Sequence, residues 1–136
     1  MYFCSSIFSE FGSYIHLFPK DKIINNVAFL SSISTTYSPK SKCLISVSVL
    51  GLHDSKVIQN SIQKKLSKYF GGSKQEYDFI KSFELKKATI KQPVYYFSNN
   101  LLTFKNKIIV AGDHTVNGSI EGAVISGLNS AYQIIN

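Results

Sequence analysis

The feature that most restricts the fold of this chain is its last thirty residues, which join a short apolar strand to a helix rich in small residues. Residues 107–111 (KIIVA) predict a nearly wholly apolar strand, of the type that is buried on both faces of a parallel sheet. Gly112-Asp113 predicts a loop, and we expect a helix from about Ser119 to Ile135. Small residues recur along this segment in two stripes, at positions 118, 122, 126 and 130 and at positions 123, 127 and 131.

Two glycines inside one helix need a physical reason. An internal Gly destabilises a helix by about 1 kcal/mol relative to Ala, so close approach of another backbone or of a flat ligand is expected here. The same helix also carries an apolar stripe, formed by Ile120, Val124, Leu128, Ile134 and Ile135. The sequence therefore predicts a helix that is packed on more than one side.

The first hundred residues predict a sheet with one packed helix. Residues 43–50 alternate apolar and Ser side chains, which indicates a strand with one buried face. Strands are also expected at residues 1–5, 14–18 and 24–33, and residues 76–89 alternate again, with Tyr77, Phe79, Phe83 and Leu85 facing inward. Residues 35–42 predict a connector, and residues 92–100 predict an extended segment leading into a loop.

The helix of this region is expected to begin at Asp54, whose carboxylate can cap it, and to end at Gly71-Gly72. Its apolar face is expected to consist of Val57, Ile58, Ile62, Leu66, Tyr69 and Phe70, with Lys64, Lys65 and Lys68 in solvent. In all, the 136 residues predict an α+β fold: a mixed, mainly antiparallel sheet with one packed helix, followed by a terminal strand–helix unit. We place the two parts at residues 1–100 and 101–136.

Composition limits the classes of function. The net charge is +7, but all fifteen basic residues are Lys and they are scattered, which favours a solvated surface over a nucleic-acid interface. No apolar run is long enough to span a membrane, and the N-terminal residues lack the pattern of a signal peptide, so we expect a cytoplasmic protein. Cys4 and Cys43 have no partner at metal-ligand spacing, so free thiols and no metal site are expected.

The string from Ile108 to Ile135 resembles the C-terminal signature of the flavin amine oxidases and of the phytoene and carotene desaturases. Their pattern is an apolar strand, Gly-Asp, a loop, and a helix of the form Gly-x-x-x-Gly-Ala-x-x-Ser-Gly-x-x-Ala-Ala. This chain matches it, with Ser130 in place of the first Ala of the last pair. A weaker likeness to the substrate domain of desaturases extends upstream, carried by Tyr37, Pro39 and Gly51.

The resemblance implies a cofactor site for FAD. It implies that the Asp113 carboxylate accepts a hydrogen bond from a ribityl hydroxyl of the flavin, and that Gly112 lets the backbone approach the cofactor. It also implies that the start of the following helix stabilises negative charge on the pyrimidine side of the flavin, with Ile120 as the first choice of N–H donor. The implied cofactor-binding residues are Gly112, Asp113, Gly118, Ser119, Ile120 and Gly122.

The likeness covers only part of such an enzyme, because the chain has no Gly-x-Gly-x-x-Gly sequence after a strand, the element that holds the FAD pyrophosphate. The resemblance thus implies the C-terminal fragment of an oxidoreductase that transfers a hydride to flavin N5 from a small apolar or amine substrate. Its partner would be the missing N-terminal dinucleotide-binding half, and the fragment alone is expected to be inactive. Ser119 stands where the monoamine oxidases have an aromatic residue, which favours a desaturase-like relative.

Two alternatives remain open. The chain could be a half-enzyme that complements a separately encoded FAD-binding chain, or a small α+β binding or interaction module without a redox role. Tyr95 and Tyr96 could line a substrate cavity, although sheet or core packing explains them as well. His114 and Glu121 are expected to be ordinary surface side chains, since nothing in the sequence pairs with the first and first-turn carboxylates are common in helices.

Overall fold

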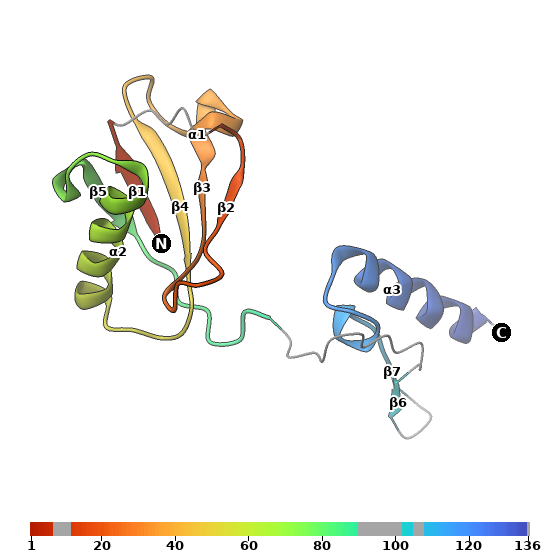
Figure 1. Ribbon diagram of the computed structural model, residues 1–136. Coiled ribbons are helices and arrows are strands. Elements are labelled where there is room, and N and C mark those ends of the chain that lie inside the picture. Colours follow the sequence, from red (N-terminus) through yellow and green to blue (C-terminus); the bar gives the residue numbers. More distant parts are fainter. Residues whose placement is uncertain (7–11, 90–101, 105–107, 136) are drawn as a thin grey trace. The chain divides into compact units, whose positions relative to one another are not determined.

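The computed structural model describes residues 1–6, 12–89, 102–104 and 108–135, and the chain divides into two compact units, residues 1–84 and 85–136. The described residues form an α+β fold with a five-stranded antiparallel sheet, a two-stranded sheet and three α-helices (Figure 1). The boundary that we expected between residues 100 and 101 lies outside the described residues, and so does the extended segment expected at residues 92–100.

Most of the secondary-structure elements in the described residues are strands. The strands are β1 (Tyr2–Ser5), β2 (Ile15–Leu17), β3 (Ile24–Phe29), β4 (Cys43–Val49), β5 (Tyr77–Lys81), β6 (Leu102–Phe104) and β7 (Ile108–Val110). The helices are α1 (Leu30–Ile33), α2 (Ser55–Phe70) and α3 (Ile120–Ile135). Short 3-10 turns occur at Thr35–Tyr37, Lys74–Glu76 and Asp113–Thr115.

The sheet of the first unit has the strand order β2-β3-β4-β1-β5. All four strand pairings in it are antiparallel, so the expectation of a mixed sheet is wrong for the described residues. The register places Phe3 and Phe29 beside Ile45, and Val27 beside Val47. Because side chains alternate along a strand, this register gathers the apolar residues on one face. The alternation expected in residues 43–50 is confirmed, with Cys43, Ile45 and Val47 buried.

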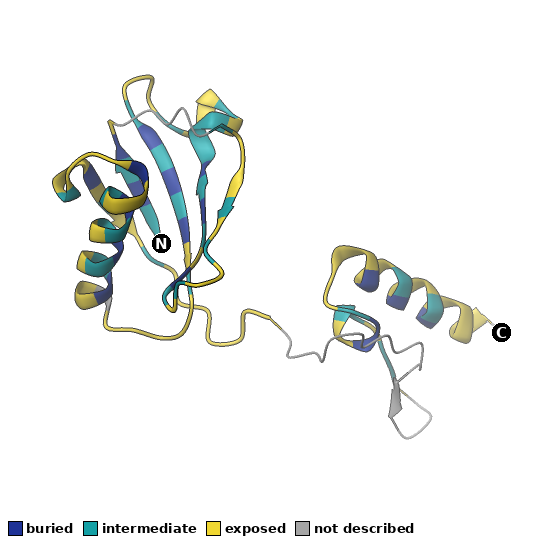
Figure 2. Ribbon diagram, in the orientation of Figure 1, coloured by how far each residue is buried: buried dark blue, intermediate teal, exposed yellow. Residues whose placement is uncertain are grey.

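Helix α2 covers that apolar face (Figures 1 and 2). Its buried residues Ile58, Ile62, Leu66 and Phe70 recur every four positions and join the strand residues in one core cluster. Val57, which we expected on this face, is 71% exposed, because one residue along a helix turns the side chain by about 100° away from the stripe. Removal of these apolar side chains from water is the main contribution to the stability of the first unit.

Both predicted ends of α2 are confirmed. The Asp54 carboxylate accepts hydrogen bonds from the backbone N–H groups of Lys56 and Val57, at 3.0 and 3.1 Å. Gly71 ends the helix with a φ of +84°, a conformation that favours glycine. The Tyr77 hydroxyl donates to the Gly71 carbonyl oxygen at 2.8 Å, and burial followed by the nearby Glu76 carboxylate raises the pKa of Tyr77 to about 12.

Two predicted strands are shorter than expected. The run at residues 24–33 divides into β3 and α1, where the Ser31 hydroxyl accepts the backbone N–H of Leu44 at 2.9 Å. The alternation at residues 76–89 forms a strand only as far as Lys81, so Tyr77 is buried while Phe83 and Leu85 are exposed. The ladder between β5 and β1 ends at the pair of Lys81 with Tyr2.

The first residue also belongs to the sheet. The amino group of Met1 donates to the Val47 carbonyl oxygen at 2.8 Å, and the Val47 N–H donates to the Met1 carbonyl oxygen at 2.8 Å. Burial lowers the pKa of this amino group. The ladder between β1 and β4 therefore extends to the first backbone nitrogen.

In the second unit, β6 and β7 form an antiparallel pair followed by the loop and α3. The expected buried strand at residues 107–111 is found as β7, but it pairs antiparallel with β6, which we did not predict, and Ile108 is exposed. The expectation of a strand in a parallel sheet is therefore wrong for the described residues. Among those residues, no helix has the length and hydropathy needed to span a membrane.

Candidate functional site

The loop between β7 and α3 is held to the helix by Gly112. Its φ of +154° and ψ of 164° lie in a region that is essentially limited to glycine. The Gly112 N–H donates to the Ser126 hydroxyl oxygen at 3.0 Å, and the Gly112 carbonyl oxygen accepts the Thr115 hydroxyl at 2.8 Å. The Thr115 and Ser126 hydroxyls lie 2.5 Å apart and are both buried. A small buried polar network therefore sets the path of the chain at the Gly-Asp pair.

A second glycine brings the loop close to the first turn of α3. A Cβ at Gly122 would lie 2.1 Å from the Asn117 carbonyl oxygen, so no larger residue fits without movement of the backbone. The Ser119 hydroxyl oxygen accepts the Gly122 N–H at 2.9 Å, as a helix N-cap does, and Ser119 donates to the Asn117 side-chain oxygen at 2.5 Å. Gly118 is exposed in the same turn. A close approach of another backbone was expected at a glycine of this helix. It is found inside the second unit, where the backbone of Asn117 lies against Gly122.

Helix α3 buries one of its two stripes of small residues, and its large apolar residues are exposed (Figure 2). Gly122, Ser126 and Ser130 are its buried residues. The second small stripe, Ala123, Gly127 and Ala131, is exposed, and nothing lies within 4 Å of a Cβ at Gly127. The exposed large residues of the helix are Ile120, Val124, Leu128, Tyr132, Ile134 and Ile135.

Asp113 follows Gly112 at the surface of this loop. One of its carboxylate oxygens accepts the backbone N–H of His114 at 2.8 Å, and the His114 Nδ1 atom lies 3.9 Å from the same oxygen. The other carboxylate oxygen has no hydrogen-bond partner among the described residues. With half of the side chain accessible, Asp113 can accept a hydrogen bond from an external hydroxyl group.

The start of α3 presents two backbone donors, the N–H groups of Ile120 and Glu121. The Ser119 N–H already donates to the Asn117 carbonyl oxygen at 2.7 Å, and the Gly122 N–H donates to Ser119. The described part of the chain offers no acceptor to the N–H groups of Ile120 and Glu121. Together with the positive end of the helix dipole, these two N–H groups favour a negatively charged or electron-rich group. The Glu121 carboxylate in the same turn opposes a full negative charge there.

The six predicted site residues thus lie in one loop–helix segment, but they differ in what they offer. Gly112 and Gly122 shape the backbone, the side chain of Ser119 caps the helix, and Asp113 and Ile120 keep an acceptor and a donor that point to no described partner. Sequence reasoning did not assign a role to Thr115 or Asn117. The four-residue spacing from Gly122 to Ser126 and Ser130 was the signal that this face of the helix is packed closely.

A second cluster, at Asp21 between β2 and β3, was not predicted from the sequence. The Asp21 side chain is only 4% exposed and accepts the N–H groups of Ile23 and Ile24, at 2.8 and 3.0 Å. It also accepts the Tyr69 hydroxyl at 3.0 Å and forms an ion pair with Lys65. Burial alone would raise the pKa of Asp21, but these donors, Lys65 first, hold it well below its ordinary value.

This cluster changes the predicted environment of α2. Lys65 was expected in solvent beside Lys64 and Lys68, yet it is half-buried against the turn before β3. Tyr69 was expected in the core and instead stacks on Phe18, with ring centroids 4.7 Å apart. Both side chains therefore join α2 to the β2–β3 turn.

The chain was compared with known proteins at three levels. No family model, curated protein or solved structure matches it.

Proposed function

We propose that this chain is the C-terminal part of an FAD-dependent oxidoreductase of the amine oxidase and desaturase type. The observation that supports it best is the loop–helix segment in which one oxygen of the Asp113 carboxylate and the N–H groups of Ile120 and Glu121 have no hydrogen-bond partner among the described residues. An acceptor for a hydroxyl group and donors for an electron-rich ring edge are what a flavin needs on one side. The sequence likeness from Ile108 to Ile135 gives the same assignment.

The residues present fit part of FAD. Asp113 would accept a ribityl hydroxyl. The space that a Cβ would take at Gly112 is filled by the His114 ring, 2.6 Å away, so the cofactor would come near this backbone only after that side chain turns aside. The N–H groups of Ile120 and Glu121 would favour electron density at the pyrimidine edge of the flavin. Ser119 is less suited as a donor, since its N–H is already bonded to Asn117.

The proposed chemistry belongs to the complete enzyme. When bound, FAD would accept a hydride at N5 from an amine or an alkyl C–H of a small apolar substrate. The residues of this chain would orient one edge of the cofactor and stabilise its charge. The pyrophosphate would be held by a Gly-x-Gly-x-x-Gly segment in a separate dinucleotide-binding half, because this sequence does not contain one.

In this proposal the sheet of the first unit is part of a substrate-binding domain, and β7 with α3 belongs to the FAD-binding domain. The outward apolar residues of α3 support the need for a further partner, since a lone helix rarely exposes so many of them. The first unit, with its own core under α2, also supports the alternative of an independent α+β binding module. Co-expression with a dinucleotide-binding half separates these two cases.

The test starts from the genomic DNA beside this reading frame, which we expect to encode a strand–Gly-x-Gly-x-x-Gly–helix segment. Co-expression of that segment with this chain should give a yellow complex with one FAD, measured by its absorbance spectrum. Asp113→Ala should lower the FAD affinity by about tenfold, as expected for one lost hydrogen bond to a charged acceptor.

The control is Asp78→Ala, which removes an exposed carboxylate that is distant from Asp113 in the sequence. This change should leave FAD binding unchanged. Stoichiometric FAD on the purified chain alone would contradict the claim that this part is insufficient. A colourless co-expressed pair, or equal affinity in wild type and Asp113→Ala, would contradict the flavin proposal itself.

A further inference from the structure

A surface pocket of about 640 Å³ lies on the first unit, between the β2–β3 turn and the C-terminal half of α2. Residues 17–23 form its floor and rim, and Lys65 and Tyr69 come from α2. The Asp21 cluster fastens these two segments to each other, because its carboxylate binds the turn backbone and both α2 side chains. The walls of the pocket are therefore held in place before any ligand arrives.

The charge of this pocket is positive. Lys20, Lys22 and Lys65 line it together with Asp21, which gives three positive charges against one negative charge. The Asp21 carboxylate accepts from four donors, one of which is the Lys65 ammonium group, so it offers little to a cation. Lys20 and Lys22 are exposed and have no ion pair among the described residues.

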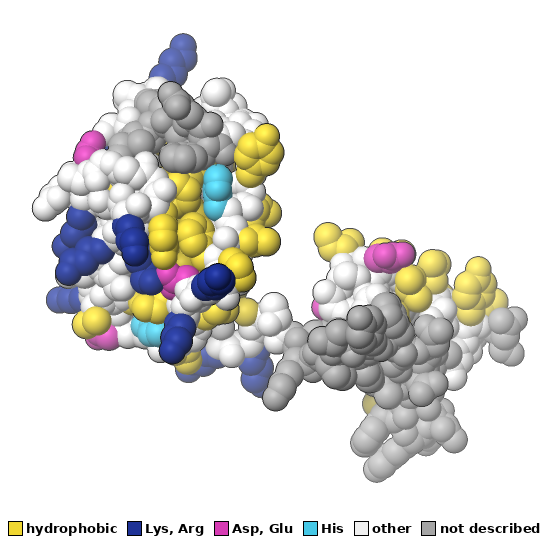
Figure 3. Space-filling view, viewed as in Figure 1, with side chains coloured by type: hydrophobic (Ala, Val, Ile, Leu, Met, Phe, Trp, Pro, Cys, Tyr) yellow, Lys and Arg dark blue, Asp and Glu magenta, His cyan; other side chains and the backbone are white. Residues whose placement is uncertain are grey.

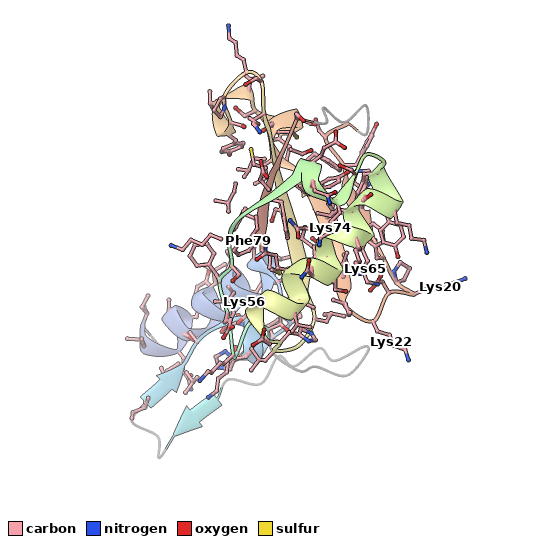
Figure 4. The ribbon with its side chains drawn as sticks, turned by 90° about the vertical axis from the view of Figure 1, so that its left-hand side faces the viewer. Lys20, Lys22, Lys56, Lys65, Lys74 and Phe79 are labelled. Atoms are coloured by element: carbon pink, nitrogen blue, oxygen red, sulfur yellow. The ribbon has the colours of Figure 1, made fainter. Side chains whose placement is uncertain are left out.

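Figures 3 and 4 show how these lysines are arranged. Dark blue side chains gather along α2 and around the turn that precedes β3 (Figure 3). Lys20 and Lys22 project outward from that turn, and Lys65 lies beside it on α2 (Figure 4). Since Lys side chains are long and rotatable, the two outer ammonium groups can move toward an anion bound at the mouth of the pocket.

The rest of the lining is apolar and partly aromatic. The Phe18 and Tyr69 rings are in contact, tilted by 36° to each other, and Leu17, Pro19 and Ile23 complete the apolar surface. Tyr69 is 37% exposed, and aromatic rings that line an open pocket suit a flat apolar body more than a branched or strongly polar one. Lysine ammonium groups around such a surface add attraction for a negative head group.

We propose that this pocket binds a small amphiphilic anion, in which a carboxylate or phosphate head group is attached to a planar apolar body. The head group lies near Lys20 and Lys22, and the planar body lies against Phe18 and Tyr69. This site is built wholly within the first unit and does not depend on the flavin proposal. Its recognition chemistry is charge at one end and ring contact at the other.

The test is a titration of the full 136-residue chain, labelled with ¹⁵N, followed by NMR. The probes are 2-naphthoate, the neutral 2-naphthamide, and acetate, which has the charge without the ring. We expect saturable shifts with 2-naphthoate in the amides of residues 17–23, Lys65 and Tyr69, and binding at least about tenfold weaker for the other two probes. Added NaCl should weaken the naphthoate binding, because exposed charges are screened.

Two matched variants separate the pocket from general charge. Lys20→Gln/Lys22→Gln should weaken 2-naphthoate binding by about tenfold, whereas Lys40→Gln/Lys56→Gln, with the same loss of charge on exposed sites elsewhere, should change it less than about twofold. Asp21 and Lys65 are left intact because they join the turn to α2. Equal binding of 2-naphthamide, equal losses in both variants, or no saturation at about 10 mM would overturn the proposal.

Discussion

The backbone N–H of Gly112 donates a hydrogen bond to the hydroxyl of Ser126, fourteen residues later and two turns into α3. Through this bond the end of β7 and the helix form one unit, and the loop between them has little freedom at the Gly-Asp pair. The close contact of Gly122 with Asn117 secures the other end of the same loop. Contacts inside the unit thus explain the buried small residues Gly122, Ser126 and Ser130, whereas the second small stripe and the large apolar residues of α3 are exposed.

The two internal glycines of α3 should respond in opposite ways to alanine. Gly122→Ala should destabilise the second unit by about 1–3 kcal/mol, because the new methyl group meets the Asn117 backbone at 2.1 Å. Gly127→Ala should stabilise the helix by about 0.5–1 kcal/mol, since its Cβ meets nothing within 4 Å. Amide hydrogen exchange in α3 measures both. Equal effects of the two substitutions would show that the contact with Asn117 does not restrict position 122.

Removal of the Asp21 charge should weaken the first unit. Asp21→Asn loses the ion pair with Lys65 and reduces the acceptor strength toward Ile23 and Ile24, so we expect a loss of about 2–3 kcal/mol in the free energy of unfolding. The matched control is Asp78→Asn, whose pair with Lys42 at 3.6 Å is exposed and should contribute less than about 1 kcal/mol. Urea unfolding followed by circular dichroism compares the two. A larger loss in the control would contradict this ranking.

The same carboxylate should make stability depend on acid. Since hydrogen bonds and Lys65 outweigh burial and hold the pKa of Asp21 below its unfolded value of 3.8, its contribution is fully present above that value and is lost as pH falls below it. Wild type should therefore lose stability below about pH 4.5 more steeply than Asp21→Asn. The comparison is needed because the Ser73 backbone also lowers the pKa of Glu76. Parallel pH profiles for the two proteins would contradict the assignment.

A charged residue on the exposed apolar face of α3 should prevent assembly without changing the stability of the chain. Leu128 is 56% exposed, so Leu128→Glu should change the free energy of unfolding of the chain by less than about 0.5 kcal/mol. It should nevertheless lower binding of a hydrophobic dye and prevent capture of the co-expressed dinucleotide-binding half. Gln133→Glu adds the same charge at another exposed position and should do neither. Assembly that survives Leu128→Glu would place the interface elsewhere.

The sequence predicted the first unit well where a single face decides the packing. The alternation in residues 43–50, the Asp54 cap and the glycine stop of α2 depend on neighbours within a few positions, and all three are confirmed. The α+β class follows from the same local signals. The extents of β3 and β5 did not follow from them, because a strand ends where its pairing ends, and the pairing partner lies far along the chain.

The less predictable features all depend on contacts between distant residues. Lys65 resembles any solvent-facing lysine until Asp21, 44 positions earlier, is placed beside it. In α3, the sequence showed both an apolar stripe and small-residue stripes, and only the fold of the loop decides which one is buried. The site residues from Gly112 to Gly122 lie in one segment, so their grouping could be predicted, but the use of the Ser119 N–H by Asn117 could not.

The backbone at Met1 has a consequence for protein engineering and for gene fusion. Its nitrogen occupies the place of a ladder amide opposite Val47, so a peptide N–H at this position would donate the same hydrogen bond without a charge to desolvate. A polypeptide joined ahead of Met1 would continue β1 in register, with its first residue beside Ser48. Because β1 lies between β4 and β5, sequence added ahead of Met1 would lengthen an inner strand of the sheet and leave the strands already paired undisturbed.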